Sequence, residues 1–244
     1  PTSTGVLFVL SLALLAAYGW HARRTRDPLL RLSLFHMRTF RVSVLGGFIT
    51  RLGIGGLPFL LPLLYQIGMG RPAWQSGLLM MPATAAAMVM KMCTAPILKR
   101  FGYKRVLTVN TLMIGVTIGL FSLLTTETPV AFIIMLGLAQ GFFNSLQFSS
   151  MNTMAYADIR TEDSSMASSI ASSFQQLSMS FGLAVGSLVT AWYLGDLPQS
   201  DRIAVMNALH HAFLTLGAVT LVSSLAFWTL RKNDGESVSQ GRAA

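Results

Sequence analysis

Residues 99–124 read KRFGYKRVLTVNTLMIGVTIGLFSLL: seven residues that include four Lys and Arg are followed by nineteen without a charged side chain. A helix needs roughly 20 mostly apolar residues to cross the hydrocarbon core of a bilayer. Because lipid offers no hydrogen-bond partners to the backbone, such a run is expected to be helical. This stretch therefore predicts a transmembrane helix that starts beside a basic loop.

The same pattern recurs along the chain, and it predicts seven spans in all. They lie near residues 4–20, 42–66, 74–98, 106–124, 129–156, 165–193 and 203–230. The composition agrees, since 52% of the 244 residues are hydrophobic and only 11% are charged, whereas soluble domains carry about 25% charged residues. We therefore predict an all-α polytopic membrane protein with seven transmembrane helices.

The basic residues are divided unevenly between the two sides of these spans. If consecutive loops alternate sides, fourteen Lys and Arg lie on one side and only Arg71 and Arg202 lie on the other. The positive-inside rule then places residues 21–41, the loop at 99–105 and the C-terminus in the cytoplasm. Topology explains the net charge of +9, so we expect a lipid bilayer and no nucleic acid as partner.

Chemistry that needs cysteine or paired carboxylates finds no support in the sequence. The single cysteine, Cys93, excludes a disulfide framework within the chain and a cysteine-based metal site. The spans contain no acidic residue and no H-E-x-x-H motif. A light-driven rhodopsin would need a lysine in the seventh span, and residues 203–230 contain none. We therefore predict neither an enzyme nor a metal or cofactor protein, and a seven-span receptor or rhodopsin remains a remote alternative.

Arg51 is the sharpest polar feature, because it falls about ten residues into the second span. Charged residues at this depth are expensive, and they face the bundle interior or a water-filled cavity. Gly47, Gly55 and Pro58 share its side of the helix. Arg51 is thus a candidate for meeting an anionic group of a substrate. The alternative is a structural ion pair with a residue outside this chain.

Two further spans carry a polar stripe with one methionine each, spaced to share a helix face. The stripes are Gln140, Asn144, Gln147 and Met151, and then Ser168, Ser172, Gln175 and Met179. Such stripes suit an adaptable, amphipathic cavity. The alternative is that their side chains only form hydrogen bonds between helices.

Several short motifs follow one another in the order of a known transporter family. They are Tyr65-Gln66-Ile67-Gly68, Gln75-Ser76-Gly77-Leu78 with Pro82, Arg100-Phe101-Gly102-Tyr103-Lys104-Arg105, and Ser164-Ser165-Met166-Ala167-Ser168 with Gln175-Gln176 and Gly182. Together they resemble the second half of the major facilitator superfamily, and more narrowly its fourteen-span drug:proton antiporters. The segment at 100–105 resembles the second copy of the cytoplasmic G-x-L-A-D-R-x-G-R-R loop. However, Ala95 and Lys99 stand where that motif has its first Gly and its Asp.

The resemblance implies the following division of the chain. Residues 1–20 would be a linking transmembrane helix, 21–41 a basic cytoplasmic linker, 42–230 the six-helix C-terminal bundle and 231–244 a cytoplasmic tail. In the family the first, second, fourth and fifth helices of this bundle line the central cavity. An N-terminal half that precedes Pro1 would complete the protein in a bacterial plasma (inner) membrane.

The function implied is secondary active transport, with proton-coupled efflux of small amphipathic compounds by alternating access. A transporter of one specific metabolite on the same fold is the alternative, since an Arg near the midplane suits an anionic substrate. The proton would be the coupling ion, with its carboxylate in the missing half. The site residues are predicted in three groups: Arg51, Gln140, Asn144, Gln147 and Gln175 in the substrate cavity; Arg100, Gly102 and Arg105 in the cytoplasmic gating loop; Pro58 and Pro62 at a helix bend.

Overall fold

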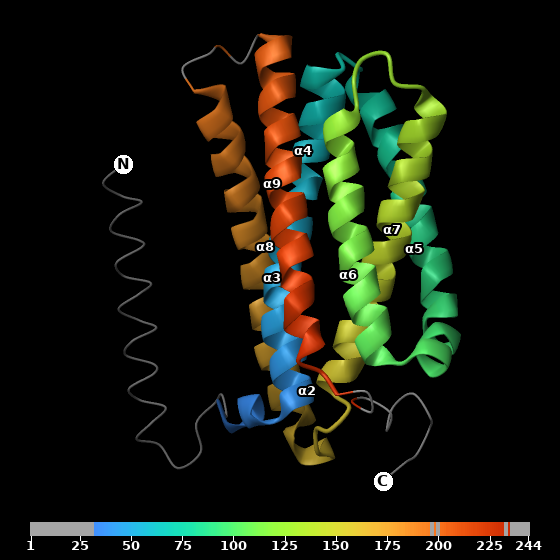
Figure 1. The fold of residues 1–244 in the computed structure, drawn as a ribbon, viewed down its shortest axis with the longest axis vertical. Coiled ribbons are helices and arrows are strands. Elements are labelled where there is room, and N and C mark those ends of the chain that lie inside the picture. Colours follow the sequence, from blue (N-terminus) through green and yellow to red (C-terminus); the bar gives the residue numbers. More distant parts are fainter. Residues whose placement is uncertain (1–31, 196–197, 199–200, 232–233, 235–244) are drawn as a thin grey trace.

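Each of the six apolar runs after residue 41 forms a helical segment long enough to cross a bilayer (Figure 1). The structure is a computed structural model that describes residues 32–195, 198, 201–231 and 234. Within these residues it is all helical, without a strand. The six predicted spans after residue 41 are therefore confirmed, with ends that differ by no more than four residues. The predicted span at 4–20 lies outside the described residues.

Five of the spans are built on one long helix each. These are α5 (Ala73–Phe101), α6 (Tyr103–Leu120), α7 (Val130–Ala155), α8 (Ser164–Leu194) and α9 (Arg202–Trp228). Short 3-10 turns at Phe121–Leu123 and Thr161–Asp163 extend α6 at its end and α8 at its start. Asp201 caps α9, because its carboxylate accepts hydrogen bonds from the amides of Ile203 and Ala204.

The remaining span, Arg38–Gly68, is made of several pieces. It consists of α2 (Arg38–Arg41), a π-helical segment (Val42–Gly46), α3 (Gly47–Gly55), α4 (Leu57–Leu63) and a second π-helical segment (Leu64–Gly68). A 3-10 turn at Leu32–His36 precedes it. Helical structure thus begins inside the predicted linker at 21–41, so that the span starts at Arg38 rather than at residue 42.

The break between α3 and α4 falls at Gly56, two residues before Pro58. Pro58 occupies the first turn of α4, where a backbone amide would have no acceptor within the helix, so the missing N–H of proline costs nothing. Pro62 lies inside α4 and cannot donate to the carbonyl one turn earlier, and the second π-helical segment begins two residues later. The structure therefore places both prolines next to irregular backbone, and their role in bending remains a prediction.

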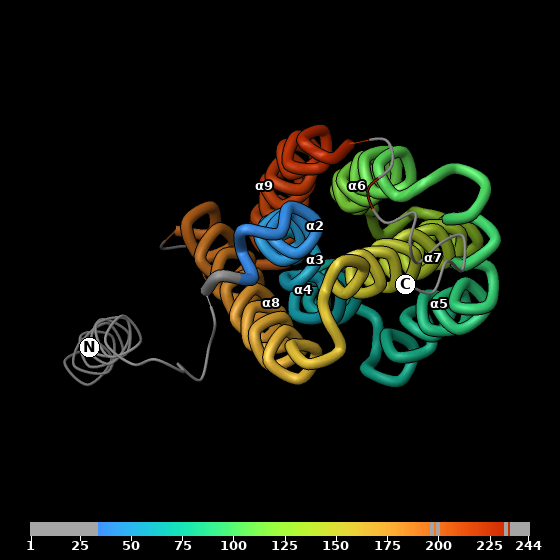
Figure 2. Tube along the Cα trace, turned by 90° about the horizontal axis from the view of Figure 1, so that it is seen from below, coloured from blue at the N-terminus to red at the C-terminus, as the bar shows by residue number. Residues whose placement is uncertain are grey.

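The helices pack as two interleaved groups. α3 packs against α8 and α9, while α7 packs against α5 and α6, and α6 joins the groups through its long contact with α9 (Figure 2). The apolar core fills the space among α4, α6 and α9, where Leu60, Ile114, Phe121, Phe213 and Leu216 are fully buried. The helix α3, from the first half of the bundle, is thus held by two helices of the second half, α8 and α9. In the same way α7, from the second half, is held by α5 and α6 of the first half.

Glycines permit two of these close approaches. A Cβ added to Gly141 of α7 would lie 1.9 Å from the carbonyl oxygen of Ala83 in α5. One added to Gly182 of α8 would lie 2.6 Å from the carbonyl oxygen of Leu52 in α3. Both neighbours are backbone atoms, so only a residue without a side chain fits.

Candidate functional site

Arg51 belongs to α3, and its side chain reaches α7. Its side chain is only 4% exposed. The guanidinium carbon lies 5.0 Å from the centroid of the Phe148 ring of α7, at cation–π distance. Gly47, one turn earlier, provides the space, since a Cβ there would lie 2.8 Å from an Arg51 Nη and 3.0 Å from the sulfur of Met151.

The guanidinium has no acidic partner among the residues that the structure describes. Its Nε is buried without a hydrogen bond, and an aromatic face compensates only part of the lost hydration of a cation. A buried charge without a counter-ion is costly. An anionic group from outside the described residues, on a ligand or on another part of the protein, would satisfy Arg51.

Only some residues in the polar stripe of α7 form hydrogen bonds with α6. Gln147 is fully buried. Its Oε1 accepts a hydrogen bond of 2.8 Å from Asn110 Nδ2, and its Nε2 donates to Thr111 Oγ1 at 2.7 Å. Asn110 also donates to the carbonyl oxygen of Phe143. The structure therefore places Gln147 in hydrogen bonding between helices, the alternative considered for this stripe.

Gln140 and Asn144 contact each other one turn apart on α7. Gln140 Nε2 donates to Asn144 Oδ1 at 3.0 Å, while Gln140 Oε1 is buried without a partner. Asn144 is half-buried. In the described part of the chain no hydrogen bond joins these amides to Arg51. They keep unused hydrogen-bonding capacity and stay candidates for the cavity.

The polar stripe of α8 lies on a helix that is largely uncovered. Gln175 is half-buried, and Ser168 and Ser172 are exposed. Like α8, α5 buries only a small share of its span inside the bundle. Among the described residues no hydrogen bond joins Gln175 to Arg51, so the two stay separate candidates.

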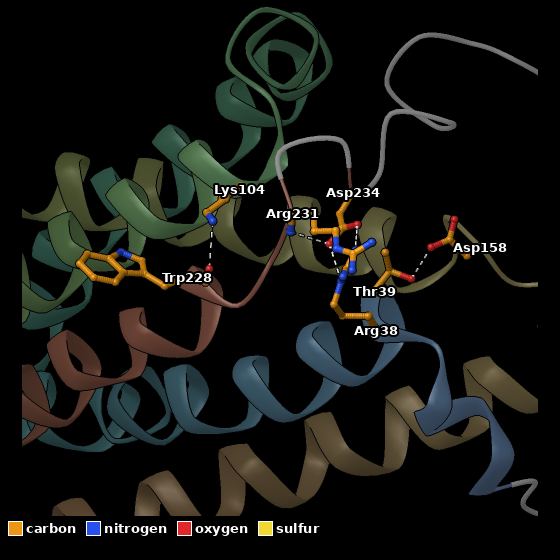
Figure 3. Close-up of polar contacts among 7 residues, drawn as sticks. All are labelled: Arg38, Thr39, Lys104, Asp158, Trp228, Arg231 and Asp234. Atoms are coloured by element: carbon orange, nitrogen blue, oxygen red, sulfur yellow. Dashed lines mark hydrogen bonds and ion pairs between the residues drawn. The ribbon is translucent and has the colours of Figure 1, made fainter.

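The basic loop joins α5 to α6 through Gly102. This residue has a φ of +75°, a left-handed conformation that favours glycine. The Arg100 guanidinium lies 5.7 Å from the centroid of the neighbouring Phe101 ring. Lys104 Nζ donates to the carbonyl oxygen of Trp228 at 2.9 Å, which ties the start of α6 to the end of α9 (Figure 3).

Comparison with known proteins decides the family. The Major Facilitator Superfamily profile matches residues 3–183 and 94–244, which together cover nearly the whole chain. The chain belongs to the major facilitator superfamily. This agrees with the all-helical, six-span architecture, and it places the chain in a family of transporters rather than enzymes.

Two relatives from enteric bacteria each carry the name "Putative multidrug resistance protein MdtD". The one from Serratia proteamaculans (strain 568) is 32% identical over 226 residues, which cover 93% of this chain and 47% of the relative. The one from Klebsiella pneumoniae (strain 342) is 34% identical over 221 residues, or 91% of this chain and 47% of the relative. The chain thus spans about half the length of the curated relatives it matches.

A polar network at the end of the bundle near α2 was not predicted from the sequence (Figure 3). Arg38 pairs with Asp234, and Thr39 Oγ1 donates to Asp158 Oδ2 at 2.7 Å. Partial burial by itself raises the pKa of the Asp234 carboxyl. The hydrogen bonds from Arg38 and the Arg231 amide, and the charges of both arginines, more than offset this, so that the pKa lies below its ordinary value.

Asn110, Thr111 and Phe148 are the other important residues that the sequence patterns did not single out. Asn110 is the single amide side chain in the run 106–124, and an amide in a span is a signal for an interhelical hydrogen bond. Phe148 gives no such signal, because a phenylalanine in a transmembrane helix commonly packs in the core or faces lipid.

Proposed function

We propose that the full-length protein is a secondary transporter that exports small amphipathic compounds in exchange for protons by alternating access. Superfamily membership and the multidrug-resistance names of the relatives support this function. The observation that carries the proposed site is Arg51, a buried cation of α3 that reaches α7 and has no acidic partner among the residues that the structure describes. With Gln140, Asn144 and Gln175 it would form this chain's share of the cavity.

Alternating access requires a second bundle that moves against this one. The relatives are about twice as long as the chain, which leaves room for such a bundle. α5 and α8 bury little of their length here, and we propose that the second bundle covers them. The loop residues Arg100, Gly102 and Arg105 would move with the cytoplasmic gate.

The proposed setting is a bacterial plasma (inner) membrane with the C-terminus in the cytoplasm. The uneven distribution of Lys and Arg supports this orientation. Since α3 to α9 contain no acidic residue within their helices, the carboxylate that exchanges protons would belong to a part of the protein outside these spans.

A second candidate function is transport of one specific anionic metabolite. The environment of Arg51 favours it, because a guanidinium binds a carboxylate or a phosphate through paired hydrogen bonds. A cationic drug would instead be repelled at this position. The two functions therefore differ in the breadth and the charge of the compounds that are moved.

The test is a panel of radiolabelled or fluorescent compounds in a strain from which the full-length gene is deleted. We expect wild-type protein to restore export of several unrelated amphipathic compounds. Arg51→Ala should lower export by roughly tenfold or more at equal expression. Arg160→Ala, which removes an exposed arginine outside the spans, is the matched control. A phenotype restricted to one anionic metabolite would favour the second function, and unchanged export in Arg51→Ala would remove Arg51 from the site.

Proton coupling is tested with the purified protein in liposomes. Export should follow an imposed pH gradient and stop when a protonophore dissipates it. Transport that persists at full rate without a gradient would contradict the proposed coupling.

A further inference from the structure

The loop between α5 and α6 forms one side of a groove whose other side is the end of α9. We call it the α6–α9 groove; its volume is about 620 Å³, and it is lined mainly by Arg100, Lys104, Arg105, Thr108, Val109 and Trp228. It lies at one end of the spans, next to the polar network of Figure 3. Arg51 belongs to α3, which does not line this groove.

The groove is strongly positive. Its described lining residues include three cations and no acidic residue. Lys99 comes directly before Arg100, at the position where the related superfamily loop has its Asp. Two acidic residues of the neighbouring network are already engaged, Asp234 by Arg38 and Asp158 by Thr39. The groove's positive charge is therefore available to a ligand.

The cations also keep donors that no described carboxylate satisfies. Lys104 Nζ reaches a backbone carbonyl oxygen, and the guanidinium of Arg100 lies against the ring of Phe101. The Thr108 hydroxyl is buried in the wall without a hydrogen-bond partner. Three cationic side chains around one groove, with no carboxylate among the described lining residues, favour an anion with several oxygen atoms, such as a phosphate group.

The rim of the groove is apolar and faces outward. Trp228 is 65% exposed and Val109 is 49% exposed. A tryptophan at the end of a span is typical of the membrane interface, where its ring lies at headgroup level. A ligand that fits both parts of the groove has an anionic head and hydrocarbon chains.

We propose that the α6–α9 groove binds the phosphodiester headgroup of an anionic phospholipid. Arg100, Lys104 and Arg105 hold the phosphate, and the acyl chains run along the exposed apolar surface of α6 and α9 beside Trp228. Basic pockets between spans at the membrane surface are suited to such headgroups. The site shares Arg100 and Arg105 with the proposed gating loop. Lipid binding is nevertheless measured separately from transport, because neither Arg51 nor the α7 amides take part in it.

The test is native mass spectrometry of the full-length protein, purified in detergent and titrated with phosphatidylglycerol or phosphatidylcholine. We expect phosphatidylglycerol to remain bound and phosphatidylcholine to be lost under the same conditions. Arg100→Gln with Arg105→Gln should weaken phosphatidylglycerol binding by roughly 25-fold, from the usual contribution of two surface cations. Arg100→Lys with Arg105→Lys keeps both charges and should bind within a few-fold of wild type.

The matched control is Arg41→Gln with Arg160→Gln, which removes two exposed cations outside the groove. It should leave phosphatidylglycerol binding unchanged. An equal loss in this control would show that net charge alone binds the lipid, and would overturn the proposal. Equal retention of phosphatidylcholine would do so as well.

Inorganic phosphate distinguishes a lipid headgroup from a free anion. Millimolar phosphate should not displace phosphatidylglycerol, because the apolar rim adds binding that the free ion lacks. Displacement at that concentration would indicate a site for soluble phosphate and contradict the lipid assignment. Circular dichroism and size-exclusion profiles of each variant must match those of wild type, and the charge-retaining Lys pair supplies the result if the Gln pair does not fold.

Discussion

Arg38 holds Asp234 with two hydrogen bonds across 196 residues of sequence: Arg38 Nε donates to Oδ2 at 2.9 Å and Nη2 donates to Oδ1 at 2.5 Å. The Arg231 amide donates to the same carboxylate. The first residue of the first described span is thereby joined to a residue just beyond the last span. This pair closes the bundle at the end where α2 lies (Figure 3).

The first prediction concerns the pH dependence of this pair. The pKa of Asp234 is lowered in the folded state, so its contribution to stability is fully present above the ordinary aspartate pKa of about 4 and is lost as the pH falls through the lower folded value. At pH 6 the melting temperature of wild type should exceed that of Asp234→Asn. The difference should be equivalent to at most about 1 kcal/mol in stability, because the pair is partly exposed. That difference should disappear in acid. A difference that grows as the pH falls would show that another group is responsible.

The second prediction uses the contact between α7 and α5. Gly141→Ala should destabilise the purified protein by roughly 1–3 kcal/mol, because the new Cβ would overlap the Ala83 carbonyl oxygen and the backbones would have to separate. Gly119→Ala is the matched control, since a Cβ there meets nothing within 4 Å. Thermal unfolding followed by intrinsic fluorescence measures both. Equal melting temperatures for the two variants would contradict the close approach.

The third prediction concerns the hydrogen bonds between α6 and α7. A double-mutant cycle of Asn110→Ala and Gln147→Ala should give a coupling energy of about 0.6 kcal/mol, and no more than about 1.7 kcal/mol. The measurement is unfolding in mixed detergent micelles. Additive effects of the two substitutions would mean that the 2.8 Å hydrogen bond between these amides contributes nothing.

The fourth prediction separates cavity residues from interhelical ones. In full-length protein without its native cysteines, including the exposed Cys93, Asn144→Cys should react with a water-soluble maleimide. Gln147→Cys should stay protected, since that position is fully buried against α6. Labelling in intact membranes, followed by mass spectrometry, gives the result. Comparable labelling at both positions would return Gln147 to the candidate cavity.

The spans could be predicted from the sequence because lipid imposes one requirement on each of them separately. A run such as 106–124 needs no knowledge of its neighbours to be recognised as a helix. The start at Arg38 could not be predicted in this way, because the helical backbone continues past the apolar run into α2, whose four residues include two arginines. The charge of Arg41 is exposed there, so the interface tolerates it.

The candidate site could be predicted only in part, because a helical stripe shows which residues share a face but not which helix covers it. Asn144 and Gln147 lie less than one turn apart, yet α6 covers Gln147 and leaves Asn144 half-buried. The pairing of Arg38 with Asp234 was equally out of reach, since no local pattern links residues so distant in sequence.

The interleaved packing of the bundle has a consequence for how the protein is made. α3 is inserted first among the described spans, but it packs against α8 and α9, which are synthesised last. α5 likewise has its main contact with α7. Neither the first three described spans nor the last three can therefore form a complete core of their own during translation. The native core is complete only when the last helix has left the ribosome, so the early helices must wait in the membrane with their contact surfaces open to lipid, to the insertion machinery or to chaperones.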